Sequence, residues 1–334
     1  MRWLMMVWMM VMLWAVPAAN AQVMTATESG LELTEGPPQV PDGWQAIETP
    51  WLTMYGPDNE IQVLMHLGRK GSAAVPRLAE QLGVPIGGTI HVVVAPTRRE
   101  FMALQGNGVP EYADGTAWPS RGHIYLQRPR IRTSERPLEQ VLEHEIVHIL
   151  LGRAFAPGRP PAWLQEGTAT VLSGEYNGEM SRQLVAAIAA GHQPDLDAIS
   201  HTFPRTQPAA SLAYAESADF IVFMRETYGD DAIAQLVDEA AQGAPLGAAV
   251  RAVTGEFLED VEPRWRRQFR SGWGSYVTLL SSWEMYWAVG GLVAMVGLVL
   301  ARRRGRKRLR EMAEEEARLD ALVANLWSSQ DQVH

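Results

Sequence analysis

The residues with the clearest capacity for chemistry lie in one short segment near the middle of the chain, residues 141–151. This segment contains His144, Glu145 and His148, with the two histidines four residues apart. In an α-helix, side chains four residues apart lie on the same face, about 6 Å apart along the axis. Both imidazoles can therefore reach one metal ion, and Glu145 can take a proton from an attacking water without binding the metal. The spacing predicts a metal centre with a general base beside it.

A third ligand is available 18 residues beyond His148. Glu166 lies in a predicted short helix that begins at Pro161, after a loop rich in proline and glycine that lets the chain turn back. Two histidines and one carboxylate leave a fourth position open, which is the geometry of a catalytic rather than a structural zinc site. The chain has no cysteine, so thiolate ligands, disulfides and cysteine nucleophiles are excluded. We expect one zinc ion per chain.

The simplest alternative is an amphipathic helix with two histidines facing solvent. The remaining residues of the segment are mostly apolar, which predicts a buried helix; they are Val141, Leu142, Ile146, Val147, Ile149, Leu150 and Leu151. Two buried and unpaired histidines would cost free energy. A bound metal removes that cost, which favours the metal centre.

The motifs HEIVH and WLQEGTA together resemble those of the gluzincin metallopeptidases, specifically the peptidase MA-like families, over roughly residues 45–270. The resemblance implies an α+β, zincin-like (thermolysin-like) domain of two lobes with zinc in the cleft. It implies the same three ligands and the same base as the spacing does. It also implies that the strand at 123–127 lies at the edge of the cleft, where an extended substrate could add by main-chain hydrogen bonds.

This chain departs from the family pattern after the third ligand. Thermolysin-like enzymes have an aspartate four residues after the third ligand, where it orients a histidine; here that residue is Thr170, so the partner of the histidine must come from elsewhere. A donor that stabilises the transition state is also needed. The segment YAES, which begins at Tyr214, resembles the family's donor region, so Tyr214 is the candidate donor. The alternatives are that Tyr214 only packs in the core, or that His192 or His201 is the donor.

Two kinds of element must position these residues. Strands are predicted at 51–56, 89–95 and 123–127, and a helix is predicted at 61–83 with Pro76 kinking or dividing it. After Pro137 the strand signals end, and helices are predicted at 137–154, 162–174, 179–190, 210–228, 230–242, 244–253 and 256–271, with Gly152 as a helix stop. We therefore expect a peptidase domain at 44–275, with a sheet-bearing lobe at 44–136 and a helical lobe at 137–275.

The N-terminal residues are typical of a secretory signal. Arg2 precedes an apolar run that ends at Ala19-Asn-Ala21, so residues 1–21 are predicted to be a signal peptide, with an uncleaved anchor as the alternative. Residues 22–43 are predicted to be a linker. The domain that follows is therefore expected outside the cytoplasm.

A second apolar run, at 285–301, is 17 residues long and is followed at once by a basic cluster. It reaches bilayer length only together with residues 276–282. Aromatic residues at its start and basic residues at its end predict a transmembrane helix at 281–301 and a cytoplasmic tail at 302–334. A buried core helix is the alternative.

The chain has a net charge of −9, although its basic residues cluster after the second apolar run, so the predicted catalytic domain is acidic. Nucleic acid is therefore excluded as a partner, which leaves a peptide or protein substrate and, through the predicted span, membrane lipid. The oligomeric state is left open.

We expect a membrane-anchored zinc metallopeptidase. Gluzincin aminopeptidases carry a G-x-M-E-N segment, and nothing like it occurs at 122–129, which favours an endopeptidase. A catalytically silent, zinc-stabilised binding or assembly protein of the same fold and a non-peptide amide hydrolase are the alternatives.

Overall fold

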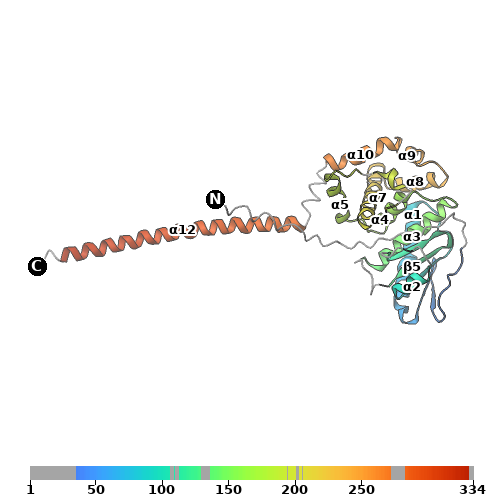
Figure 1. Cartoon of the computed structure of the whole chain (residues 1–334), viewed down its shortest axis with the longest axis horizontal. Coiled ribbons are helices and arrows are strands. Elements are labelled where there is room, and N and C mark those ends of the chain that lie inside the picture. The colour runs from blue at the N-terminus through green and yellow to red at the C-terminus, as the bar shows by residue number, and fades with distance from the viewer. Residues whose placement is uncertain are drawn as a thin grey trace. The chain divides into compact units, whose positions relative to one another are not determined.

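A computed structural model describes residues 35–105, 109, 113–128, 136–193, 195–200, 203–204, 206–271 and 283–330. The chain divides into two compact units, with the boundary between Ser271 and Gly272 (Figure 1). The predicted signal peptide at 1–21 and most of the predicted linker lie outside the described residues.

The first unit contains a mixed sheet of five strands in the order β1-β2-β3-β5-β4. The strands are β1 (Gln45–Glu48), β2 (Leu52–Gly56), β3 (Ile90–Ala95), β4 (Gly115–Trp118) and β5 (His123–Gln127). Strands β2, β3 and β5 are parallel, whereas β1 and β4 run antiparallel to their neighbours. The three strands predicted from the sequence are the parallel ones, and their strong β-branched and apolar character matches their central position.

The prediction that the strand at 123–127 lies at the edge of the cleft is wrong. Strand β5 has a partner on each side, since Tyr125 pairs with Val93 of β3 and with Thr116 of β4. Among the described residues, β4 pairs only with β5 and forms the edge of the sheet. The chain leaves β3, forms the edge strand first and then returns inside it as β5, an order that the sequence pattern does not reveal.

Two long helices, α1 (Ile61–Leu82) and α3 (Leu138–Phe155), share one hydrophobic core with a face of the sheet. Helix α1 is a single helix that contains Pro76. A Cβ atom on Gly71 would lie 2.5 Å from Leu52 Cδ1 and 2.8 Å from Leu142 Cδ2. The missing side chain therefore lets α1 lie close to both β2 and α3. The short helix α2 (Arg98–Ala103) packs through Phe101 against the opposite face of the sheet.

The helical part follows the sheet, as predicted, and lies beside it in the first unit (Figure 1). Its helices are α4 (Ala162–Leu172), α5 (Gly178–Ala189), α6 (Leu196–Ser200), α7 (Gln207–Tyr228), α8 (Ala232–Ala241), α9 (Leu246–Thr254) and α10 (Leu258–Ser271). Two 3-10 turns, η1 (Asp58–Glu60) and η2 (Pro119–Arg121), lie in the sheet-bearing part of the chain. One continuous core joins the sheet, α1 and α3 to the later helices. Helix α4 packs against α3, which carries the predicted ligands, and α7 packs against α4.

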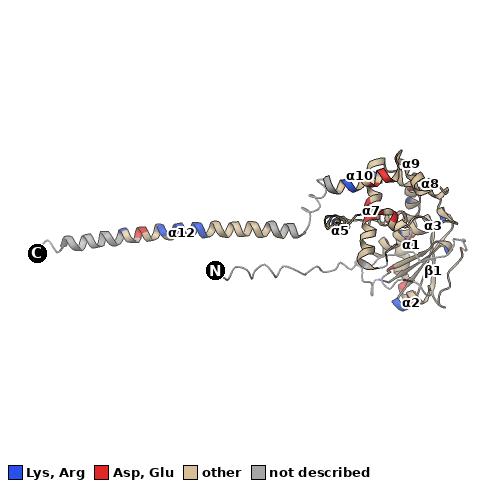
Figure 2. Ribbon diagram, turned by 45° about the horizontal axis from the view of Figure 1, so that its top comes forward, with Lys and Arg blue, Asp and Glu red and all other residues tan. Residues whose placement is uncertain are grey.

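The second unit is described by one helix, α12 (Trp283–Gln330). Within the described part of the chain, no helix combines the length and the apolar character needed to cross a membrane. The predicted transmembrane helix at 281–301 is therefore wrong, and so are the predicted single-pass membrane location and the lipid contact through it. The apolar run ends at Ala301, and residues 276–282, on which its sufficient length depended, lie outside the described part. Basic residues follow the run along α12 (blue in Figure 2).

Candidate metal centre

Helix α3 is buried on nearly all sides. Apolar residues such as Val141, Ile146 and Ile149 are fully buried in the core, and His144, Glu145 and His148 are themselves 0 % exposed. A helix with apolar residues all round is stable only inside a protein. The three polar side chains are therefore held in an environment that excludes water, where each needs a partner.

Helix α4 brings Glu166 to the same place. It packs against both α3 and α7, and Gly167 makes the second contact possible, because a Cβ atom there would lie 2.5 Å from the carbonyl oxygen of Ser217 on α7. With α7 this close to Gly167, α4 presents the preceding residue, Glu166, toward the histidines. Glu166 is 4 % exposed.

The side chains of His144, His148 and Glu166 converge on one point. Oε2 of Glu166 lies 3.5 Å from Nε2 of His144 and also 3.5 Å from Nε2 of His148. One ligand atom from each residue lies within 4.8 Å of the others, so this group could hold a metal ion. The two imidazole rings are 4.7 Å apart between centroids. The structure thus brings together the three residues that the sequence predicted.

The other nitrogen of each histidine has a partner that the sequence analysis did not find. Nδ1 of His144 lies 3.1 Å from Oε1 of Glu175, and Nδ1 of His148 lies 3.0 Å from the amide nitrogen Nε2 of Gln165. A histidine that binds a metal through Nε2 commonly has its Nδ1 beside a carboxylate such as that of Glu175, which fixes the ring orientation. Glu175 thus contacts the ligand histidine in place of the aspartate that thermolysin-like enzymes have at the position of Thr170.

Glu175 is placed by the way α4 ends. Gly174 has a left-handed φ of 75°, its N–H donates to the carbonyl of Val171, and the N–H of Glu175 donates to the carbonyl of Thr170. These two bonds form a Schellman motif, with Glu175 as the residue just beyond the left-handed glycine. A glycine eleven residues after the start of the helical WLQEG segment, followed by a glutamate, was the available signal in the sequence.

Glu145 lies beside the three converging residues on α3. Both of its carboxylate oxygens are buried and have no hydrogen-bond partner within the described part of the chain. Burial raises the pKa of Glu145 well above the usual value, and this outweighs the opposing effect of His144. A raised pKa suits a group that must accept a proton and pass it on near neutral pH.

The histidines differ in charge when no metal is bound. Burial alone would lower the pKa of His144, but the carboxylates of Glu175 and Glu166 outweigh it and raise the pKa to about 10. Burial, together with the nearby His144, holds the pKa of His148 well below its usual value. The site therefore carries one imidazolium and one neutral imidazole when it is metal-free.

Tyr214 lies on α7, is 5 % exposed and forms a hydrogen bond with the Glu166 carboxylate. Its ring also packs on Phe203, with 4.7 Å between ring centroids. The structure thus places Tyr214 next to the converging residues. The alternative donor His192 pairs instead with Glu216, and His201 lies outside the described residues.

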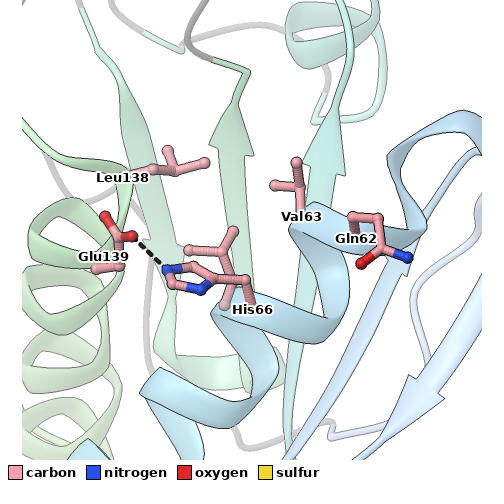
Figure 3. Close-up of a pocket in the computed structure, with 6 residues that line it drawn as sticks. Gln62, Val63, His66, Leu138 and Glu139 are labelled. Carbon is pink, nitrogen blue, oxygen red and sulfur yellow. Dashed lines mark hydrogen bonds and ion pairs between the residues drawn. The ribbon is translucent and has the colours of Figure 1, made fainter.

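A separate pocket of about 330 Å³ lies between α1 and the start of α3 (Figure 3). Within it, Nε2 of His66 lies 2.6 Å from Oε1 of Glu139, and Val63 and Leu138 contribute apolar walls. None of the predicted site residues lines this pocket, so the chemistry of the buried centre does not extend into it.

Residues 72–271, more than half of the 334-residue chain, match the sequence model of the Peptidase MA superfamily. The chain belongs to this superfamily. The match begins within α1 and ends with α10, so in this Peptidase MA chain it includes every residue of the candidate metal centre. No curated protein sequence matches the chain significantly.

Among solved structures, this Peptidase MA chain is similar to an M1 zinc metallopeptidase from Deinococcus radiodurans, at 19 % identity and a TM-score of 0.39, over 68 % of this chain and 51 % of that one. A mutant M1 zinc metallopeptidase from the same organism has 18 % identity and a TM-score of 0.40 over the same shares. A two-domain M1 zinc metallopeptidase mutant bound to L-tryptophan has 18 % identity and a TM-score of 0.38, over 67 % of this chain and 50 % of that one. The chain spans about half the length of these enzymes.

Proposed function

We propose that this chain is a zinc-dependent peptidase in which His144, His148 and Glu166 hold one zinc ion and Glu145 is the general base. The observation that carries the proposal is the convergence of Nε2 of both histidines on one oxygen of Glu166, at 3.5 Å each. Membership of the Peptidase MA superfamily supports the reaction class.

The residues present fit a zinc ion. Nε2 of His144, Nε2 of His148 and Oε2 of Glu166 are all buried and lack a hydrogen-bond partner among the described residues, and buried polar atoms without partners are costly. Two imidazoles and a carboxylate are a donor set that zinc prefers, with a fourth position left for water or substrate. Glu175 holds the ring of His144 so that Nε2, rather than Nδ1, points inward.

Zinc, when bound, polarises the scissile carbonyl and lowers the pKa of water. Glu145 accepts the proton of the attacking water and then delivers it to the departing amine nitrogen. Its two oxygens make no competing hydrogen bond to the described residues, so they are available to the water. The positive charge of zinc lowers the pKa of Glu145 from its metal-free value toward the range in which it can act as a base.

We assign Tyr214 as the donor that stabilises the oxyanion. Its hydroxyl lies at the Glu166 carboxylate, beside the metal ligands. Burial raises the pKa of Tyr214 well above its usual value, and the carboxylate of Glu166 adds to the effect. The hydroxyl therefore stays protonated and able to donate throughout the working pH range.

An extended peptide would pair with the edge strand β4, which lies directly against Glu145 at Gly115. Strand β4 has the sequence GTAW and offers no acidic side chain. Asp114, just before it, pairs with Arg136 at 3.7 Å. Gluzincin aminopeptidases bind the free amine of their substrate through the glutamate of a G-x-M-E-N segment, and β4 has no counterpart of it. Cleavage within a chain, as by an endopeptidase, is therefore favoured.

The test compares metal content and cleavage of casein or a peptide library by the full chain and by Glu145→Gln. We expect one zinc ion in both proteins and cleavage only by the first. Glu143→Gln is the matched control, because Glu143 precedes the first ligand on the same helix but pairs with Arg77 at the surface, so this variant should cleave normally. Zinc in all three without cleavage would favour a binding protein, and absence of zinc would refute the proposal.

A further inference from the structure

We propose that Arg136 is a positioning residue that fixes Glu175 and, through Glu175, the imidazole of the metal ligand His144. The inference rests on the proposed function only in requiring that His144 binds the metal. It does not depend on which substrate is cleaved.

Each oxygen of Glu175 has a separate partner. Oε1 lies 3.1 Å from Nδ1 of His144, and Oε2 accepts a hydrogen bond from NH1 of Arg136. The exposed fraction of the side chain falls along this series, from 20 % for Arg136 through 8 % for Glu175 to 1 % for His144. The arginine thus lies at the outer end of a chain of contacts that leads inward to the metal ligand.

Arg136 is itself held at two points. Its other terminal nitrogen, NH2, lies 3.7 Å from Oδ2 of Asp114, at the start of the edge strand β4, and the next residue is Pro137, which directly precedes α3. A residue before proline has a restricted backbone, and the planar guanidinium can hold two carboxylates in a fixed relative geometry. The second contact therefore links the position of the metal ligand to the strand beside Glu145.

The position of the Glu175 carboxylate depends on the contact with Arg136 for two reasons. Glu175 lies in the turn that ends α4 rather than within a helix, and its buried carboxylate would be costly with a neutral imidazole as its only partner. An ion pair with arginine keeps the carboxylate ionised and in one rotamer. The imidazole of His144 then lies beside a carboxylate of fixed position.

Positioning and simple electrostatics predict opposite effects for removal of Arg136. A cation near the site repels zinc, so loss of its charge alone would tighten zinc binding. If Arg136 positions Glu175, its loss weakens zinc binding, because a loosened partner of a ligating histidine typically costs 10–100-fold in metal affinity. The sign of the change therefore separates the two effects.

The test measures the zinc dissociation constant of the full chain by competition with a chelator. We expect Glu175→Gln to weaken zinc binding by about 10–100-fold and Arg136→Gln to weaken it by about tenfold. Arg136→Lys should recover part of the affinity, since lysine supplies the charge but not the fork. In a protein that already carries Glu175→Gln, Arg136→Gln should change the zinc dissociation constant by no more than a factor of about two, because its effect passes through Glu175.

Arg77→Gln is the matched control. Arg77 also pairs with a carboxylate on α3, that of Glu143, but this pair is partly exposed to solvent, so zinc affinity should stay unchanged. Unchanged or tighter binding in Arg136→Gln, or full additivity with Glu175→Gln, would overturn the inference. If Arg136→Gln fails to fold, Arg136→Lys with and without Glu175→Gln decides in the same way. A wild-type chain that binds no zinc would overturn the proposed function as well.

Discussion

Gly115 of the edge strand lies in direct contact with the carboxylate of Glu145. A Cβ atom at Gly115 would be 2.7 Å from Oε1 of Glu145 and 2.8 Å from Cγ1 of Val141. Gly115 thus lets β4 run against α3 at the position of the proposed base. The same closeness places the main chain of β4 where a substrate paired with it would reach that base.

Gly115→Ala should lower kcat by about 100-fold, because a displacement of roughly 1 Å in a catalytic group has an effect of that size. Zinc content should remain at one per chain, since the atoms nearest to a Cβ at Gly115 belong to Glu145 and Val141 and not to a ligand. Steady-state kinetics and metal analysis measure both quantities. The matched control is Gly247→Ala on α9, where a Cβ atom would meet nothing within 4 Å; equal activity of the two variants would contradict the assignment of Glu145.

Tyr214→Phe removes the hydroxyl beside Glu166 while keeping the ring that packs on Phe203. We expect kcat to fall by about 10²–10³-fold, the usual effect of losing one oxyanion donor, with little change in KM or zinc content. Tyr228→Phe on the same helix removes a buried hydroxyl that has no hydrogen-bond partner in the described structure. It should leave kcat unchanged. Full activity of Tyr214→Phe would make Tyr214 a packing residue.

Zinc binding should release protons above neutral pH. In the metal-free protein Glu175 and Glu166 outweigh burial and raise the pKa of His144 to about 10, while the unfolded value is about 6.5. The bound proton therefore stabilises the folded state fully below pH 6.5, and this contribution is lost as the pH rises through about 10. Since zinc requires the neutral imidazole, binding at pH 8 displaces that proton.

Isothermal titration calorimetry at pH 8 in buffers of different ionisation enthalpy measures this release. We expect at least one proton per zinc, and an affinity that increases about tenfold per pH unit between pH 7 and 9. His148 contributes none, because its pKa is lowered by burial. Zinc binding without proton release would mean that His144 is neutral beside Glu175.

Tyr176, the residue after Glu175, anchors the turn that carries Glu175. The hydroxyl of Tyr176 donates to Oδ2 of Asp219 at 2.5 Å, and Nε1 of Trp265 donates to Oδ1 of the same carboxylate at 2.7 Å. Tyr176→Phe leaves this buried carboxylate one donor short, so the free energy of unfolding should fall by about 1–3 kcal/mol. Urea denaturation measures it. Tyr125→Phe, which loses only a 3.5 Å contact with His123, should cost at most about 0.5 kcal/mol.

The sequence by itself determined the local part of the centre. Helical spacing puts His144 and His148 on one face whatever the rest of the chain does, and the apolar residues around them predict burial. The same local patterns predicted the three central strands and the bounds of most helices to within a few residues. Such periodicity reflects which face of an element is buried, and this is settled over a few residues.

Only the tertiary structure decided which distant residues complete the centre. Glu175 reaches His144 because a left-handed glycine reverses the chain after α4. The edge strand is β4 rather than β5, because β5 lies between β3 and β4 in the sheet. Gly152 was predicted to stop α3 but lies inside it. A glycine is needed there because a Cβ atom would be 2.2 Å from Pro119. The type of a residue shows whether it has a hydrogen-bonding group or lacks a side chain. Which residue it contacts depends on how separate elements pack.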